Sequence, residues 1–79
     1  MALLLTDGFK RDEKNRNSIS SHTAGTYTSF DYEGKHYFQI NTYGSATREV
    51  RGKSSQNLQI DEEGAKVIVE LLKREFHLD

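Results

Sequence analysis

The feature that most constrains the fold of this 79-residue chain is a run of alternating side chains that leads directly into a helical pattern. Within residues 26–32, 35–43 and 55–60, polar and apolar residues alternate with a period of two, which is the period of a strand with one buried face. From residue 61 to 76 the apolar spacing changes to three and four, as in an amphipathic helix. The sequence therefore predicts an α+β domain: a small antiparallel sheet of three to four strands with one C-terminal amphipathic helix packed on one face.

The strands are expected at residues 26–32, 35–43 and 55–60. Glu33 and Gly34 form a short turn between the first two strands, because glycine supplies the positive φ that a tight hairpin needs. The first two strands should therefore form a hairpin.

The helix is expected to start after Asp61 and to run to about Phe76. Aspartate is a favourable N-cap, and the carboxylates of Glu62 and Glu63 lie where the helix dipole favours negative charge. Basic residues follow near the C-terminal end, where the dipole favours positive charge.

The alternation assigns side chains to two faces of the sheet. The face expected under the helix carries Phe30, Tyr32, Phe38, Ile40, Leu58 and Ile60. The other face carries Tyr27, Tyr37, Gln39, Asn41, Tyr43, Asn57 and Gln59. A single helix covers only one face of a small sheet, so the second face should meet water or a partner.

The helix has more apolar surface than one contact needs. One stripe, meant for the sheet, consists of Ala65, Ile68, Leu72 and Phe76, and Val69 widens it. Val67 and Leu71 lie on the flank. Either a widely wrapping sheet buries them, or they form the interface of a homodimer; the second reading is favoured because a chain this short, with 34% hydrophobic residues, has a thin core.

Residues 1–25 differ from the domain predicted at 26–79. Residues 10–21 are almost wholly polar and cannot bury enough surface to offset their ordering entropy. We expect this N-terminal tail to be flexible when the protein is alone, with residues 2–5 forming either a short edge strand or a loose apolar tail.

Composition excludes several classes of protein. The net charge of -1 excludes a uniformly basic nucleic-acid binder, and the absence of cysteine excludes a disulfide framework. No apolar run approaches the ~20 residues of a membrane span, so we expect a cytoplasmic protein with no membrane association.

No catalytic or metal-binding pattern is convincing. The three histidines, at positions 22, 36 and 77, lack metal-ligand spacing, and no serine lies in a nucleophile elbow. The run Gly52-Lys53-Ser54 is followed by a strand and not by the helix that a phosphate loop opens. We therefore expect that the protein is not an enzyme and that it binds no metal ion and no cofactor.

The remaining functional signal is a surface. Residues 34–60 carry a local charge of +3, whereas residues 61–79 carry -3. Tyrosines, amides and basic edges together suit single-stranded DNA or RNA, whose bases stack and whose phosphates are anionic. The expected contacts lie on the uncovered sheet face and in the basic loop 44–54, and they are Lys35, Tyr37, Gln39, Asn41, Tyr43, Arg48, Arg51 and Lys53.

Two other interpretations stay open. Tyrosine is common in strands and outer sheet faces are usually polar, so the surface can be purely structural. Tyrosine and arginine are also frequent in protein interfaces, so the chain can be a protein-interaction module, for example a small phage or mobile-element protein that modulates a larger bacterial protein.

Over residues 27–76 the order of elements resembles the positive cofactor four family of transcriptional coactivators. The parallels are the Gly34-Lys35 turn, the strand 38–43, the loop Arg51-Gly52-Lys53, and the strand 57–60 that leads into the acidic helix start. The resemblance implies a curved sheet, a helix-mediated homodimer, binding of single-stranded DNA and a role in transcription regulation. Asn41, Asn57 and Ala65 depart from the family's arginine, glycine and large aromatic residue, which puts its binding contacts in doubt.

Overall fold

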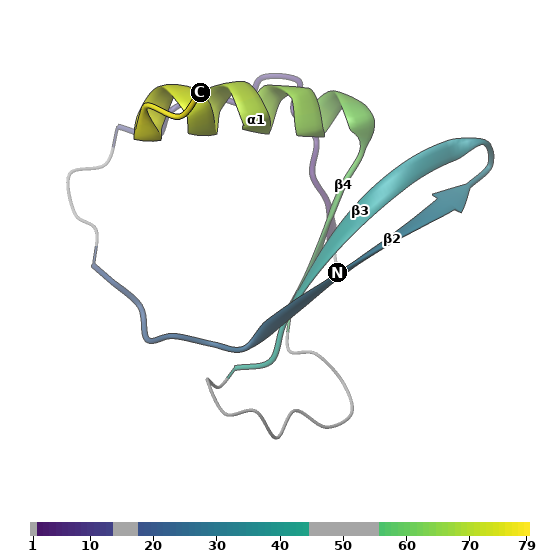
Figure 1. The fold of residues 1–79 in the computed structure, drawn as a ribbon, viewed down its shortest axis with the longest axis horizontal. Coiled ribbons are helices and arrows are strands. Elements are labelled where there is room, and N and C mark those ends of the chain that lie inside the picture. Colours follow the sequence, from purple (N-terminus) through teal and green to yellow (C-terminus); the bar gives the residue numbers. More distant parts are fainter. Residues whose placement is uncertain (1, 14–17, 45–55) are drawn as a thin grey trace.

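The chain folds into a four-stranded open sheet followed by one helix, which confirms the α+β prediction (Figure 1). The structure is a computed structural model that describes residues 2–13, 18–44 and 56–79. Its elements are β1 (Ala2–Leu3), β2 (Gly25–Tyr32), β3 (Lys35–Thr42), β4 (Gln56–Ile60) and α1 (Glu62–Phe76).

The strand order in the sheet is β1-β4-β3-β2. The pairs β2–β3 and β3–β4 are antiparallel, as expected, but β1 runs parallel to β4, so the sheet is mixed. The N-terminal residues therefore join the sheet beside its last strand, and β2 is left as the opposite edge.

A two-residue turn fixes the register of the β2–β3 hairpin. Glu33 and Gly34 both have positive φ, 50° and 79°, as a type I′ turn requires. Tyr32 therefore pairs directly with Lys35, and the pairing continues through Phe30 and Tyr37.

This register corrects the predicted sorting of the β2 side chains. Directly paired residues point to the same face, so Phe30 lies beside Tyr37, and Tyr32 beside Lys35. Tyr27 pairs with Ile40 and lies on the opposite face. The predicted faces were correct for β3 and β4 and wrong for β2, because a shift of one residue moves every side chain of a strand to the other face.

The ends of α1 follow from its sequence. The Asp61 carboxylate accepts a hydrogen bond of 2.8 Å from the backbone N–H of Gly64, which makes Asp61 the N-cap. His77 ends the helix in the left-handed conformation, and its backbone N–H donates to the carbonyl of Lys73.

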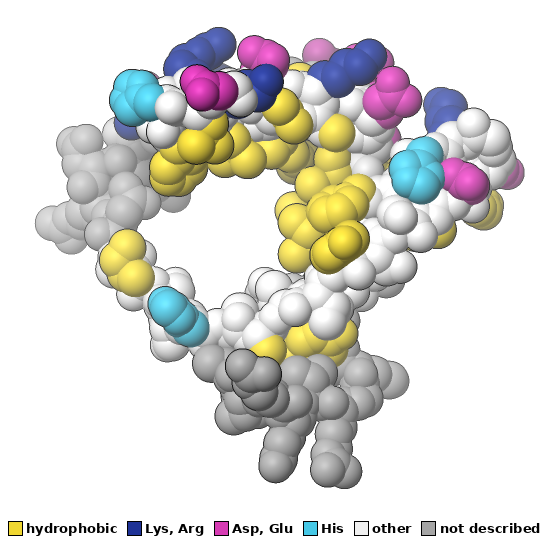
Figure 2. All heavy atoms as spheres, in the orientation of Figure 1, with side chains coloured by type: hydrophobic (Ala, Val, Ile, Leu, Met, Phe, Trp, Pro, Cys, Tyr) yellow, Lys and Arg dark blue, Asp and Glu magenta, His cyan; other side chains and the backbone are white. Residues whose placement is uncertain are grey.

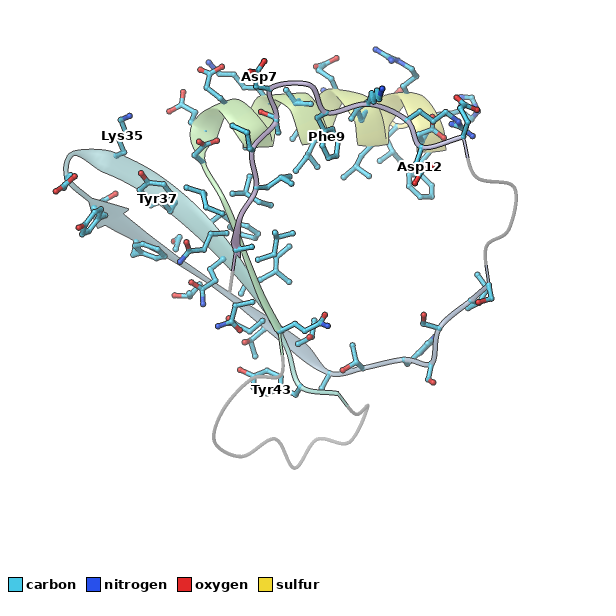
Figure 3. All side chains as sticks on the ribbon, turned by 180° about the vertical axis from the view of Figure 1, so that it is seen from behind. Asp7, Phe9, Asp12, Lys35, Tyr37 and Tyr43 are labelled. Atoms are coloured by element: carbon cyan, nitrogen blue, oxygen red, sulfur yellow. The ribbon has the colours of Figure 1, made fainter. Side chains whose placement is uncertain are left out.

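The N-terminal segment lies along α1 (Figures 1 and 3). A Cβ atom added to Gly64 would lie 3.5 Å from a Thr6 methyl group, and the Arg11 guanidinium lies 3.6 Å from a Glu75 carboxylate oxygen. Between these two contacts the chain makes a turn, in which the Phe9 N–H donates to the Thr6 carbonyl at 3.0 Å. Residues 6–11 therefore follow the helix with a turn at Asp7 and Gly8.

The helix contacts the sheet through β4. Ile60, at the end of β4, is 8% exposed and is the only buried hydrophobic residue in the described part of the chain. Gly64 is buried against it, since an added Cβ would lie 3.2 Å from the Ile60 side chain. The core is thus centred on the junction between β4 and α1.

Candidate nucleic-acid interface

One face of the sheet carries most of the residues predicted to bind nucleic acid. We call it the amide face; by strand register and alternation it includes Thr26, Phe30, Tyr32, Lys35, Tyr37, Gln39, Asn41, Tyr43, Asn57 and Gln59. The other face, with Tyr27, Phe38, Ile40, Leu58 and Ile60, is the apolar face. Because Ile60 meets α1, the helix lies on the apolar side and leaves the amide face uncovered.

A ladder of hydrogen bonds crosses the amide face from β4 to β2. The side-chain N–H of Gln59 donates to the side-chain oxygen of Gln39 at 2.9 Å. The side-chain N–H of Gln39 donates in turn to the side-chain oxygen of Asn41 at 2.7 Å. Asn41 donates to the Thr26 hydroxyl at 3.1 Å, and this hydroxyl lies 3.0 Å from the Tyr43 hydroxyl. The ladder holds side chains from three strands in fixed positions.

Aromatic rings occupy the hairpin end of the same face. Phe30 and Tyr37 stack across β2 and β3 with ring centroids 5.7 Å apart and planes 23° apart. With Tyr32, Leu3 and Gln59 they line an open depression of about 330 Å³. A flat aromatic surface beside a depression is a suitable site for a planar ring to stack.

The charge on the two faces differs. Among the residues of β2, β3 and β4 the only carboxylate is Asp31, and it lies on the apolar side, 2.6 Å from the Nδ1 atom of His36. Lys35 lies on the amide face beside the turn (Figure 3). The strand residues of the amide face are therefore free of acidic groups that would repel a phosphate.

Five of the eight predicted binding residues belong to this face. Lys35, Tyr37, Gln39, Asn41 and Tyr43 follow one another at alternate positions along β3 and its continuation, where the Tyr43 N–H donates to the Ala24 carbonyl at 3.1 Å. Figure 3 shows Tyr37 near the turn and Tyr43 at the far end. The other three, Arg48, Arg51 and Lys53, lie outside the described residues.

Sequence reasoning missed three contributors to the amide face. The alternation assigns Phe30 and Tyr32 to the helix side, and it does not single out Thr26, which joins the ladder. The signal was present in the turn: a two-residue loop at Glu33-Gly34 makes Tyr32 and Lys35 direct partners and so determines the face of every β2 residue.

The predicted dimer residues Val67 and Leu71 are both half-buried. Leu71 lies seven positions after Gly64 and four before Glu75, on the side of α1 that the N-terminal segment follows. Val67 lies next to this side. Their role in a dimer stays a prediction.

Neither a metal-binding group nor a membrane-spanning helix is found among the described residues. No group of three or more side chains that could hold a metal ion occurs within residues 2–13, 18–44 and 56–79, and over the same ranges no helix has the length and apolar character needed to cross a membrane.

The chain matches no protein-family model, no curated protein and no solved structure.

Proposed function

We propose that the protein binds single-stranded DNA or RNA on its amide face, without catalysis. The observation that carries this proposal is the joint placement of the Phe30–Tyr37 stack, exposed Tyr32 and the amide ladder on one face whose strand residues include no carboxylate. Unpaired bases stack on strand aromatics and form hydrogen bonds through their edges, which is how sheet surfaces recognise single strands.

The dimensions of the face agree with this mode of binding. Tyr37 and Tyr43 are six residues apart along β3 and its continuation, which corresponds to about 20 Å. This length suits the two or three bases that a four-stranded sheet typically stacks. Lys35 supplies a cation at one end, and Arg48, Arg51 and Lys53 are proposed to contact phosphates beyond the other.

The ladder leaves hydrogen-bonding capacity for bases. A carboxamide can make four hydrogen bonds, two as donor and two as acceptor. In the ladder the Gln39 side chain accepts one from Gln59 and donates one to Asn41. Half of its capacity is thus used to fix its orientation, and the other half is proposed to read base edges.

The test is fluorescence anisotropy of a labelled single strand of about 20 nucleotides, titrated at low and moderate salt. We expect affinity to fall steeply as salt rises, because phosphate contacts release counterions. Tyr37→Ala should weaken binding roughly 5- to 150-fold, since loss of one base stack costs about 1–3 kcal/mol.

His36→Ala is the matched control, because His36 precedes Tyr37 in β3 and points to the other face. It should leave the affinity unchanged. Absence of binding at low salt, or equal effects of the two substitutions, would contradict the proposal.

A second candidate function rests on the edge strand β2. All eight residues of Gly25–Tyr32 are exposed, and among the described strands only β3 pairs with this strand. Such an edge can accept an extended segment of a partner protein through backbone hydrogen bonds. Partner binding at this edge would be much less sensitive to salt than nucleic-acid binding, so the same titration series separates the two functions.

A further inference from the structure

Two uncovered hydrophobic surfaces border the same opening in the molecule. One is the apolar face of the sheet, and the other is the stripe of α1 formed by Ala65, Ile68, Val69, Leu72 and Phe76, which we call the helix stripe. Figure 2 shows hydrophobic side chains of the helix along the upper border of this opening and those of the sheet along its right border.

The helix does not close over its own sheet because its start is fixed. Only Asp61 separates β4 from α1, and Gly64 packs directly against Ile60. The side of the helix that holds Gly64, Leu71 and Glu75 follows residues 6–11. The helix stripe lies about 90° around the axis from that side, given 100° per residue, and points into the opening.

These surfaces are large, given that Ile60 is the only buried hydrophobic residue among those the structure describes. The side chains concerned are between 37% and 73% exposed: Tyr27, Phe38, Ile40 and Leu58 on the sheet, and Val69, Leu72 and Phe76 on the helix. Since large apolar side chains present about 150–250 Å² each, their exposed parts amount to roughly 600 Å² per chain. This approaches the ~800 Å² that each partner contributes to a standard interface.

We propose that a second copy of this chain covers both surfaces, with the helix stripe of each copy lying on the apolar face of the other. Each copy has one uncovered apolar face and one uncovered helix stripe, so a two-fold axis covers both at once, as a self-complementary interface requires. The stripe and the central part of the apolar face hold no charged side chain; the Asp31–His36 pair lies at the hairpin end. An uncharged surface suits a second apolar surface and not an anionic ligand.

This interface differs from the flank position of Val67 and Leu71 and is independent of the ligand of the amide face. The first test uses the unmodified protein. Light scattering should give twice the chain mass of 9.1 kDa. The thermal midpoint should rise by roughly 3–6 °C for each tenfold increase in protein concentration, because folding and association are then one equilibrium. A folded monomer at about 100 μM with a constant midpoint would overturn the proposal.

The second test locates the interface. The chain contains no cysteine, so single introduced thiols report on single positions. Leu72→Cys chains mixed with Ile40→Cys chains should form a covalent heterodimer with a short thiol cross-linker, whereas Lys73→Cys, one residue outside the stripe, should not.

A chain that carries both Leu72→Cys and Ile40→Cys tests the alternative, in which the helix of the same chain covers the apolar face. A covalent dimer from this double variant supports exchange between copies. A link confined to one chain would show that α1 closes over its own sheet and would overturn the proposal.

Discussion

The type I′ turn decides which aromatic side chains share the amide face, and it can be tested by two substitutions of opposite effect. Glu33 is a non-glycine residue in the left-handed region, at φ 50°. Asparagine tolerates this conformation better than glutamate, so Glu33→Asn should raise the free energy of unfolding by about 0.5–1 kcal/mol. Gly34 has φ 79°, so Gly34→Ala should lower the same quantity by about 1–2 kcal/mol.

Both effects are measurable by thermal unfolding followed by circular dichroism at one protein concentration. At 4–8 °C per kcal/mol for a domain of this size, the midpoint should rise by roughly 2–8 °C for Glu33→Asn and fall by roughly 4–16 °C for Gly34→Ala. Gly8→Ala is the control for strain alone, since Gly8 has φ 80°, has no atom within 4 Å of an added Cβ, and lies outside the sheet.

Nuclear Overhauser contacts test the register itself. In the Glu33→Asn variant the ring of Phe30 should contact that of Tyr37, and the ring of Tyr27 should contact that of Phe38, as their centroid distances of 5.7 Å and 5.3 Å imply. A lower midpoint for Glu33→Asn, or contacts that join Phe30 to Phe38, would refute the type I′ register.

Two further predictions concern the start of α1. Asp61→Ala removes the acceptor of the 2.8 Å bond from Gly64 and should lower the free energy of unfolding by about 1 kcal/mol, whereas Asp61→Asn, which keeps an acceptor, should restore most of it; equal losses would show that the cap contributes little. Gly64→Ala should also destabilise the protein, although alanine favours helices by about 1 kcal/mol. Its Cβ would lie 3.1 Å from the Asp61 carboxylate and 3.2 Å from buried Ile60, so a raised thermal midpoint would show that these neighbours can move.

The elements themselves were predictable because their signals are local. Alternation located β2, β3 and β4 to within about one residue, and the N-cap Asp61 with its acidic first turn located the start of α1. These signals depend on neighbours in sequence, since a strand period and a helix cap each involve only a few consecutive residues.

Relations between elements were harder to predict. The apolar rings of Phe30 and Tyr32 suggested the helix side, but hydrophobicity alone cannot determine the face of an edge strand that is exposed on both sides. The parallel pairing of β1 with β4 joins residues 2–3 to residues 58–59, and no local pattern encodes such a distant contact. The sequence also predicted that the helix stripe packs on the sheet, but it did not indicate that α1 contacts the sheet mainly at β4, next to Ile60.

The corrected register separates the two proposed interactions in space. With Phe30 and Tyr32 on the amide face, this face gains two of the aromatic residues that a single strand of nucleic acid would use. The apolar face keeps Tyr27 and Phe38, which stack with centroids 5.3 Å apart and continue the hydrophobic surface offered to a second copy. A dimer formed through the apolar faces would leave both amide faces on its outside, so dimer formation and strand binding would not compete. Two outward faces in one particle would also raise the affinity for a strand long enough to reach both, because the second contact is then intramolecular.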